Sequence, residues 1–127
     1  MLSTDIRLLS AKAKIGVPEI NLGLFPGADV HRQPIGAEEA VALGLANRVV
    51  APEALMDEAL ALAETIASKS PLALRYLKRT IDAGADMPLP AALAHEQAMI
   101  SLVLDSEDAH EGCRAFLEKR EARFKGA

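Results

Sequence analysis

The sequence has few aromatic residues and a single cysteine. Phenylalanine, tyrosine and tryptophan make up 3% of the 127 residues, so alanine, leucine, isoleucine and valine must fill any core. With Cys113 as the only cysteine, no internal disulfide can form, which fits a reducing compartment. No apolar run approaches the ~18 residues that span a bilayer, and Asp5 and Arg7 interrupt any signal-peptide pattern. We therefore expect a cytoplasmic protein.

An excess of either charge is also lacking. The formal net charge is −4, with lysine and arginine spread among aspartate and glutamate, so neither nucleic acid nor a membrane is an expected partner. A local basic patch stays open near the C-terminus, where four basic residues lie close together: Lys119, Arg120, Arg123 and Lys125. The three histidines are scattered, so no metal site is expected. No glycine-rich loop of the kind that binds phosphate occurs either.

The pattern of residues changes near residue 50. Before it, the sequence predicts short elements: strands within 5–10, 13–20 and 46–50, turns over 21–29, irregular chain over 30–36, and a helix over 36–44. After it, apolar residues at helical spacing predict four helices: 52–70, 71–84, 87–106 and 107–124. We therefore expect two regions, 1–50 and 51–127.

Several residues fit particular places in these helices. Gly44 is expected just past the end of the first helix, and Ser106 is expected to cap the last one. Leu93, Ile100 and Val103 are expected to point inward from helix 87–106. The charged run from 118 to 125 is expected to form a solvated helix face.

Three long segments follow one another along almost the whole chain: residues 5–28, 34–79 and 106–126. Within them, "PEINLGLFPGA" (18–28) and "EGCRAFLEKREARFKG" (111–126) are the most specific. In this order the segments resemble the C-terminal half of the enoyl-CoA hydratase/isomerase (crotonase) family.

The resemblance implies an α/β fold that is mostly α in this chain. Residues 1–50 would be a remnant of the family's spiral core, and residues 51–127 its helical region, which builds homotrimers or hexamers. It implies acyl-CoA thioesters as substrates, with no cofactor beyond the coenzyme A that the substrate carries. Two backbone amides would hold the thioester oxygen as an enolate-like anion develops, while carboxylates move protons during hydration or isomerisation.

The resemblance also implies roles for three residues. Glu19, in "VPEI", takes the position of the second hydratase glutamate, which passes a proton to or from the substrate carbon. Three apolar neighbours could form a wall that suits such a carboxyl group: Val17, Ile20 and Leu22. Phe116 and Lys119 would contact the adenine or the phosphates of coenzyme A, often across a subunit boundary. The alternative is an ordinary amphipathic helix with Phe116 inward and Lys119 outward.

The sequence departs from the family pattern in two ways. The first hydratase glutamate and a glycine-rich segment with one oxyanion-binding amide would lie before Met1, and the other amide still further upstream. After residue 32 a glycine run and a helix are absent, which indicates an internal deletion, and Asp29 and Val30 stand where glycines are expected.

Three functions stay open from these observations. The first is a member of the family that uses Glu19 as general acid/base but is incomplete as an autonomous enzyme. The second is a non-catalytic, truncated crotonase-like protein that serves as a helical association module. The third is a plain helical interaction domain with no ligand.

Overall fold

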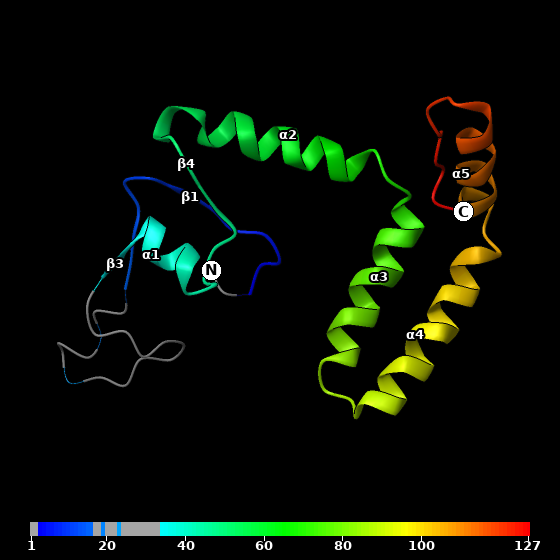
Figure 1. The fold of residues 1–127 in the computed structure, drawn as a ribbon, viewed down its shortest axis with the longest axis horizontal. Helices are drawn as coiled ribbons and strands as arrows, with labels where there is room; N and C mark the ends of the chain where they lie inside the picture. The colour runs from blue at the N-terminus through cyan, green and yellow to red at the C-terminus, as the bar shows by residue number, and fades with distance from the viewer. Residues whose placement is uncertain (1–2, 17–18, 20–22, 24–33) are drawn as a thin grey trace. The chain divides into compact units, whose positions relative to one another are not determined.

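A computed structural model describes residues 3–16, 19, 23 and 34–127 of the chain. Its elements, drawn in Figure 1, are β1 (Leu8–Ser10), β2 (Lys14–Ile15), β3 (Ile35–Gly36), α1 (Ala37–Ala42), β4 (Arg48–Val50), the 3-10 turn η2 (Pro52–Ala54), α2 (Leu55–Ala67), α3 (Pro71–Gly84), α4 (Leu89–Leu104) and α5 (Glu107–Glu118). They form two compact units, Met1–Leu62 and Ala63–Ala127, and each is described by itself. The predicted boundary after residue 50 stays a prediction about the family's regions.

The first unit is built from two short strand pairs and one helix. β1 pairs with β4 in parallel, with Leu9 opposite Val49, and β2 pairs with β3 in antiparallel register. A small core forms where α1 meets these strands; its buried residues are Leu9, Ile35, Ala37, Ala40 and Ala46. Alanine dominates this core because its small side chain lets helix and strands approach closely.

A local sequence signal accounts for the C-terminal end of α1. Gly44 has a φ of 75°, in the left-handed region where glycine carries no steric penalty, and its N–H donates to the carbonyl of Val41. This confirms the position expected for Gly44. Beyond it, Arg7 ties the chain to β1: its backbone N–H donates to Asn47 Oδ1 at 2.8 Å, and its Nε donates to the carbonyl of Leu45 at 2.6 Å.

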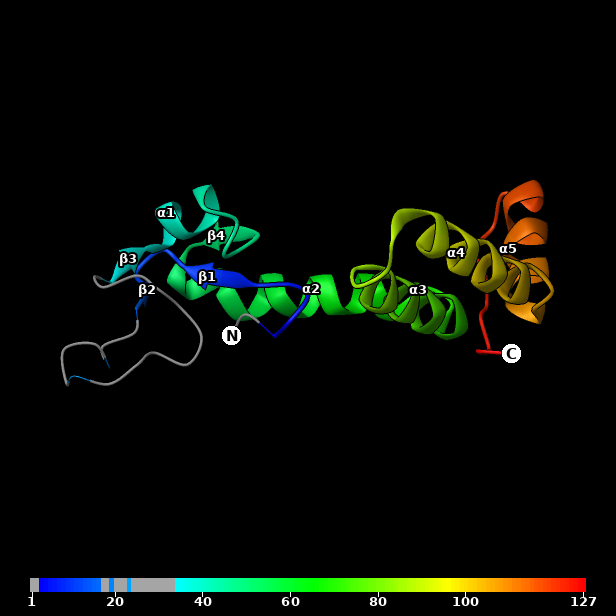
Figure 2. The same cartoon turned by 90° about the horizontal axis from the view of Figure 1, so that it is seen from below.

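The second unit contains a helical hairpin. α3 and α4 lie side by side and antiparallel in both views (Figure 1 and Figure 2). Ser70 caps α3 by accepting from the N–H of Ala73 at 3.1 Å, and Pro71 occupies the first helical position, where a missing N–H costs nothing. These two signals explain why the predicted helix 71–84 is confirmed. Ser106 caps α5 in the same way, through the N–H of Ala109, as expected.

Much of the apolar surface of this hairpin is exposed in the part of the chain that the structure describes. Leu93 is 50% exposed and Ile100 is 49% exposed, so their expected inward position is wrong. α3 and α4 pack mainly against each other, which leaves much of each apolar stripe open, because no third layer of the described residues covers them. In α3, α4 and α5, the one buried apolar residue is the small Ala115 of α5, and the other buried residue is Asp108.

Two further expectations need correction. Residues 35–36 are not irregular but form β3, because their backbone pairs with β2, some twenty positions earlier in the chain. The last helix ends at Glu118 instead of 124, and residues 119–127 turn back along it. The turns expected over 21–29 lie mostly outside the described residues. None of the helices that the structure describes combines the length and the apolar character that crossing a membrane would require.

Candidate functional site

Glu19 belongs to the first unit and is partly buried. Its Oε2 atom is buried, and within the described part of the chain it has no hydrogen-bond partner. Most buried polar atoms in folded proteins are paired, so an unpaired carboxylate oxygen needs a reason. The apolar wall expected around it, from Val17, Ile20 and Leu22, lies outside the described residues.

Only one other buried side-chain polar atom lacks a partner among the described residues, and it lies elsewhere. It is Nε2 of His95, on α4 in the second unit. The described residues also bring together no group of three histidine, cysteine, aspartate or glutamate side chains that could hold a metal ion. Among the described residues, Glu19 is therefore the one carboxylate with a buried oxygen that lacks a hydrogen-bond partner.

Phe116 and Lys119 lie at the end of α5 in the second unit. Phe116 is 82% exposed and its neighbour Leu117 is 80% exposed, so the alternative with Phe116 inward is wrong. A large aromatic side chain this exposed offers a flat apolar surface to a ligand or partner. Lys119 is exposed, and its ammonium forms no ion pair with any residue that the structure describes. The two side chains are three positions apart, close to one helical turn.

Lys119 has an unusual backbone conformation. Its φ of 53° and ψ of 42° lie in the left-handed region, and no other described residue except glycine has positive φ. The N–H of Lys119 donates to the carbonyl of Phe116, and the N–H of Arg120 donates to that of Ala115. This pair of bonds is the usual way in which a helix ends at a left-handed residue, although glycine normally occupies that place.

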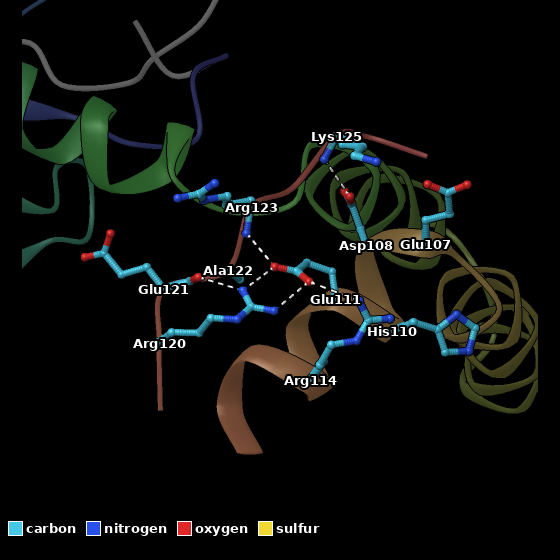
Figure 3. A pocket seen from close by; sticks show the side chains of 10 residues that line it. All are labelled: Glu107, Asp108, His110, Glu111, Arg114, Arg120, Glu121, Ala122, Arg123 and Lys125. Carbon is cyan, nitrogen blue, oxygen red and sulfur yellow. Dashed lines mark hydrogen bonds and ion pairs between the residues drawn. The ribbon is translucent and has the colours of Figure 1, made fainter. Parts of the chain in front are cut away.

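Beyond Lys119 the chain is fastened to α5 by two carboxylates. We call this arrangement the tail clamp; its members are Asp108 and Glu111 on α5, and Arg120, Arg123, Lys125 and Gly126 on the tail. Figure 3 shows these residues except Gly126, with the bonds between those that are drawn. The charged run 118–125, expected to be a solvated helix face, thus forms most of a tail that turns back along α5.

Glu111 holds the first part of the tail. Its two oxygens accept from Arg120 at 2.6 and 3.0 Å, and Oε1 also accepts from the N–H of Arg123 at 2.9 Å. Arg120 donates from Nε to Glu118 as well, at 2.6 Å. The hydrogen bond from Arg120, followed by that from Arg123, lowers the pKa of Glu111 from 4.5 to about 2. In turn Glu111, and then Glu118, raise the pKa of Arg120.

Asp108 holds the last part of the tail and is only 2% exposed. Its carboxylate accepts from Ser70 Oγ at 2.6 Å, from the N–H of Lys125 at 2.7 Å and from the N–H of Gly126 at 3.0 Å. Burial by itself would raise the pKa of Asp108, but these hydrogen bonds outweigh it and the pKa is lowered. Asp108 therefore joins three segments: the start of α3, the start of α5 and the end of the chain.

An open cavity of about 930 Å³ lies between α5 and the tail (Figure 3). Side chains of both signs line it, among them Glu107, Arg114 and Arg123. Because the charges are mixed and Glu111 is already paired with Arg120, the cavity selects no ion of one sign. Its residues serve mainly to hold the tail.

The sequence did not point to the tail clamp. Asp108 and Glu111 lie in the first two turns of a predicted helix, where acidic residues are common, and this position alone gives neither a partner. Their partners on the tail are 9 to 18 positions away, beyond the reach of helical spacing. The one available signal was an arginine and a lysine following a helix that carries two carboxylates one turn apart.

This chain is similar in sequence to several known proteins. A sequence profile described as enoyl-CoA hydratase/isomerase matches residues 30–127. The crotonyl-CoA hydratase of Syntrophomonas wolfei is 36% identical over 138 residues, which cover 94% of this chain and 53% of that protein. A short-chain-enoyl-CoA hydratase of Clostridioides difficile is 36% identical over 133 residues, with 91% and 86% covered.

Solved structures are similar over the same length. The enoyl-CoA hydratase of Bacillus anthracis has a TM-score of 0.92 and 33% sequence identity, covering 99% of this chain and 56% of that one. The chain spans about half the length of most curated relatives that it matches. The match with the Syntrophomonas wolfei protein runs over 138 positions although this chain has 127 residues, so it contains gaps in this chain. Such gaps are what an internal deletion predicts. The expected α/β fold class is confirmed.

Proposed function

Because the chain belongs to the enoyl-CoA hydratase/isomerase family, we propose that it acts in the hydration or isomerisation of an acyl-CoA thioester. In this proposal Glu19 passes a proton to or from the substrate carbon. The observation that carries it is the buried Oε2 of Glu19, which has no partner among the described residues. A carboxylate oxygen that is held out of water and still open can accept a proton from a bound substrate, or return it.

Phe116 and Lys119 supply the proposed contacts to coenzyme A. The exposed ring of Phe116 suits the flat adenine, and the ammonium of Lys119 suits a phosphate. Both groups are open at the end of α5, where a ligand can reach them without displacing the core. Their position three residues apart lets one nucleotide touch both.

We further propose that these 127 residues alone do not complete the reaction. Prearranged backbone donors to the thioester oxygen usually provide a large share of the barrier reduction in such chemistry, on the order of 3 kcal/mol for one donor. The family resemblance assigns these donors to segments that match none of these residues. The whole activity then needs partner segments equivalent to the other half of the related hydratases.

Calorimetric titration with coenzyme A, together with an assay of crotonyl-CoA hydration, tests this proposal. We expect saturable binding that is weakened in both Phe116→Ala and Lys119→Ala, and no turnover above background. Absence of any binding by a folded chain would rule out the proposed contacts. A clear rate that is lost in Glu19→Gln would support the role of Glu19 and overturn the proposed incompleteness.

A second candidate function is association through the helical hairpin. It is supported by the exposed apolar side chains along α3 and α4, among them Leu77 at 57% and Ile81 at 60%. Leu77 borders a groove of about 250 Å³ that Tyr76, Met99 and Val103 also line. A chain that forms a stable trimer or hexamer by light scattering but binds no coenzyme A would favour this non-catalytic function.

A further inference from the structure

The left-handed conformation of Lys119 is unexpected from its own side chain. A residue with a Cβ atom pays about 1 kcal/mol or more for this conformation, and glycine pays almost nothing. Outliers of this kind persist where the surroundings determine them, and they are concentrated at functional positions. The lysine at this position therefore needs two explanations: which contacts hold its backbone in the left-handed conformation, and what its side chain does.

Local sequence preference does not hold it there. Residues 119–124 read Lys-Arg-Glu-Ala-Arg-Phe, mostly good helix formers, and they predict a helix that continues to 124. The structure instead reverses the chain at Lys119 and ends α5 at Glu118. Contacts with other parts of the chain must therefore outweigh the local preference.

Those contacts belong to the tail clamp. The guanidinium of Arg120 forms two parallel hydrogen bonds with Glu111, at 2.6 and 3.0 Å, a geometry that both groups favour strongly. In a continued helix, residue 120 would lie nine residues further along the helix axis than Glu111, too far away for this ion pair. The pair therefore forms only if the chain reverses at residue 119. The ring of Phe124 adds to it by packing over α5, where a Cβ at Gly112 would lie 3.5 Å from it.

We propose that the ion pair of Glu111 with Arg120 is a positioning device for Lys119. It holds the backbone of Lys119 in the left-handed conformation. This fixes the direction in which the side chain of Lys119 extends from the end of α5, so that its ammonium and the ring of Phe116 can both contact coenzyme A. Glu111 and Arg120 thus act on the phosphates of the ligand through Lys119, without touching them. The role of Lys119 rests on the proposed function, whereas the hold on its backbone does not.

Two effects of the ion pair are tested on the full 127-residue chain: its hold on the backbone of Lys119 and its effect on the binding of coenzyme A. Nuclear magnetic resonance reports the backbone, because a residue with positive φ gives a strong NOE between its own Hα and amide hydrogen. We expect this NOE at Lys119 in the wild type, and its loss in Glu111→Gln and in Arg120→Gln, with helical carbon shifts spreading into residues 119–124. If the NOE persists in both variants, the positioning role is wrong, whether or not the chain binds coenzyme A.

Calorimetry with coenzyme A as the probe then reports the consequence. We expect Glu111→Gln to weaken binding by about tenfold, the loss typical of one misplaced charged contact. In a chain that already carries Lys119→Ala, the same substitution should weaken binding no further, since Glu111 acts through Lys119. Equal losses in both backgrounds would show a general structural effect and overturn the proposal.

A matched control separates charge from position. Glu121→Gln removes the same charge two positions from Lys119, and the carboxylate of Glu121 points away from Arg120 (Figure 3). We expect it to leave both the NOE and the affinity unchanged; affinity lost equally in Glu121→Gln would contradict a positioning role. If no variant and no wild-type chain binds coenzyme A while the NOE behaves as expected, the proposed function fails and the hold on the backbone stands.

Discussion

At the scale of single residues, the proposed function of Lys119 and the stability of the chain oppose each other. The residue keeps a Cβ atom where the backbone has positive φ, and its charged end is left open to solvent. Glycine would fit this backbone better but would provide no ammonium. A protein that retains lysine here gives up some stability for a positioned charge.

This opposition predicts that Lys119→Gly stabilises the chain. Removing the Cβ relieves the left-handed strain, and the greater freedom of glycine in the unfolded chain offsets part of the gain. The net increase in the free energy of unfolding should be about 0.5–1 kcal/mol, measured by urea denaturation. Lys119→Ala keeps the Cβ and should bring no such gain. A less stable glycine variant would show that Lys119 makes stabilising contacts of its own.

Glu111 makes the tail clamp sensitive to acid. Its pKa is lowered in the folded chain from 4.5 to about 2, so the folded state binds its proton less readily than the unfolded state does. The stability that this carboxylate contributes is therefore fully present above pH 4.5 and is lost as the pH falls toward 2.

The measurement is the urea midpoint between pH 6 and 2 for the wild type and for Glu111→Gln. We expect the difference between the two chains to shrink as the pH falls below about 4.5, because glutamine imitates the protonated acid. A difference that stays constant down to pH 2 would mean that the ion pair with Arg120 does not stabilise the folded chain.

At the scale of elements, the tail depends on Asp108 more than on its own sequence. Three donors from three segments meet its carboxylate: the hydroxyl of Ser70 and the amides of Lys125 and Gly126. Since an amide group in place of the carboxylate can accept with only one atom, Asp108→Asn should release the end of the tail. We expect hydrogen exchange at Lys125 and Gly126 to become about tenfold faster or more.

The matched control for this substitution is Asp105→Asn. Asp105 is exposed at the end of α4, three positions before Asp108, and the same chemical change there should leave the exchange of the two tail amides as it was. Unchanged exchange in Asp108→Asn would contradict the anchoring role of its carboxylate.

The helices differ in how much of them could be predicted from sequence. α3 is predicted to the residue because Ser70 and Pro71 mark its start and the glycine of its last turn marks its end. The end of α5 could not be predicted, since residues 119–124 favour helix and only distant ion pairs reverse them. β3 was missed for a similar reason: two residues form a strand only because β2 is there to pair with them.

The candidate site was predictable only in part. Glu19, Phe116 and Lys119 were found through segments that resemble a family, and the exposure of Phe116 could not be read from its helical spacing. The tail clamp has no local pattern, because Glu111 and Asp108 bind partners on the tail that are 9 to 18 positions away. Sequence reasoning thus named the proposed ligand contacts but missed the two carboxylates that hold the tail.

At the scale of the whole molecule, the exposed apolar faces predict self-association. Large side chains along the hairpin remain half exposed or more, among them Leu77, Ile81 and Leu93. Burying them against another copy would recover about 25 cal/mol per Å² of apolar surface removed from water. We therefore expect a trimer or larger species in solution, measured by light scattering.

Two variants of one helix separate an apolar interface from general loss of solubility. Leu77→Asn, in the groove, should shift the species toward monomer. Arg75→Asn lies on the exposed side of the same helix and should leave the assembly unchanged. Equal assembly of both variants with the wild type would place the interface elsewhere.

The proposed chemistry depends on Glu19, and one measurement tests it most directly. The matched part of the Syntrophomonas wolfei crotonyl-CoA hydratase is replaced by this chain, and crotonyl-CoA hydration is followed for the folded chimera with and without Glu19→Gln. Loss of a general acid/base lowers rates by about 10² or more, so we predict turnover in the first chimera and a loss of that size in the second. Equal rates in the two chimeras would contradict the role of Glu19, as would a folded chimera that binds crotonyl-CoA without turnover.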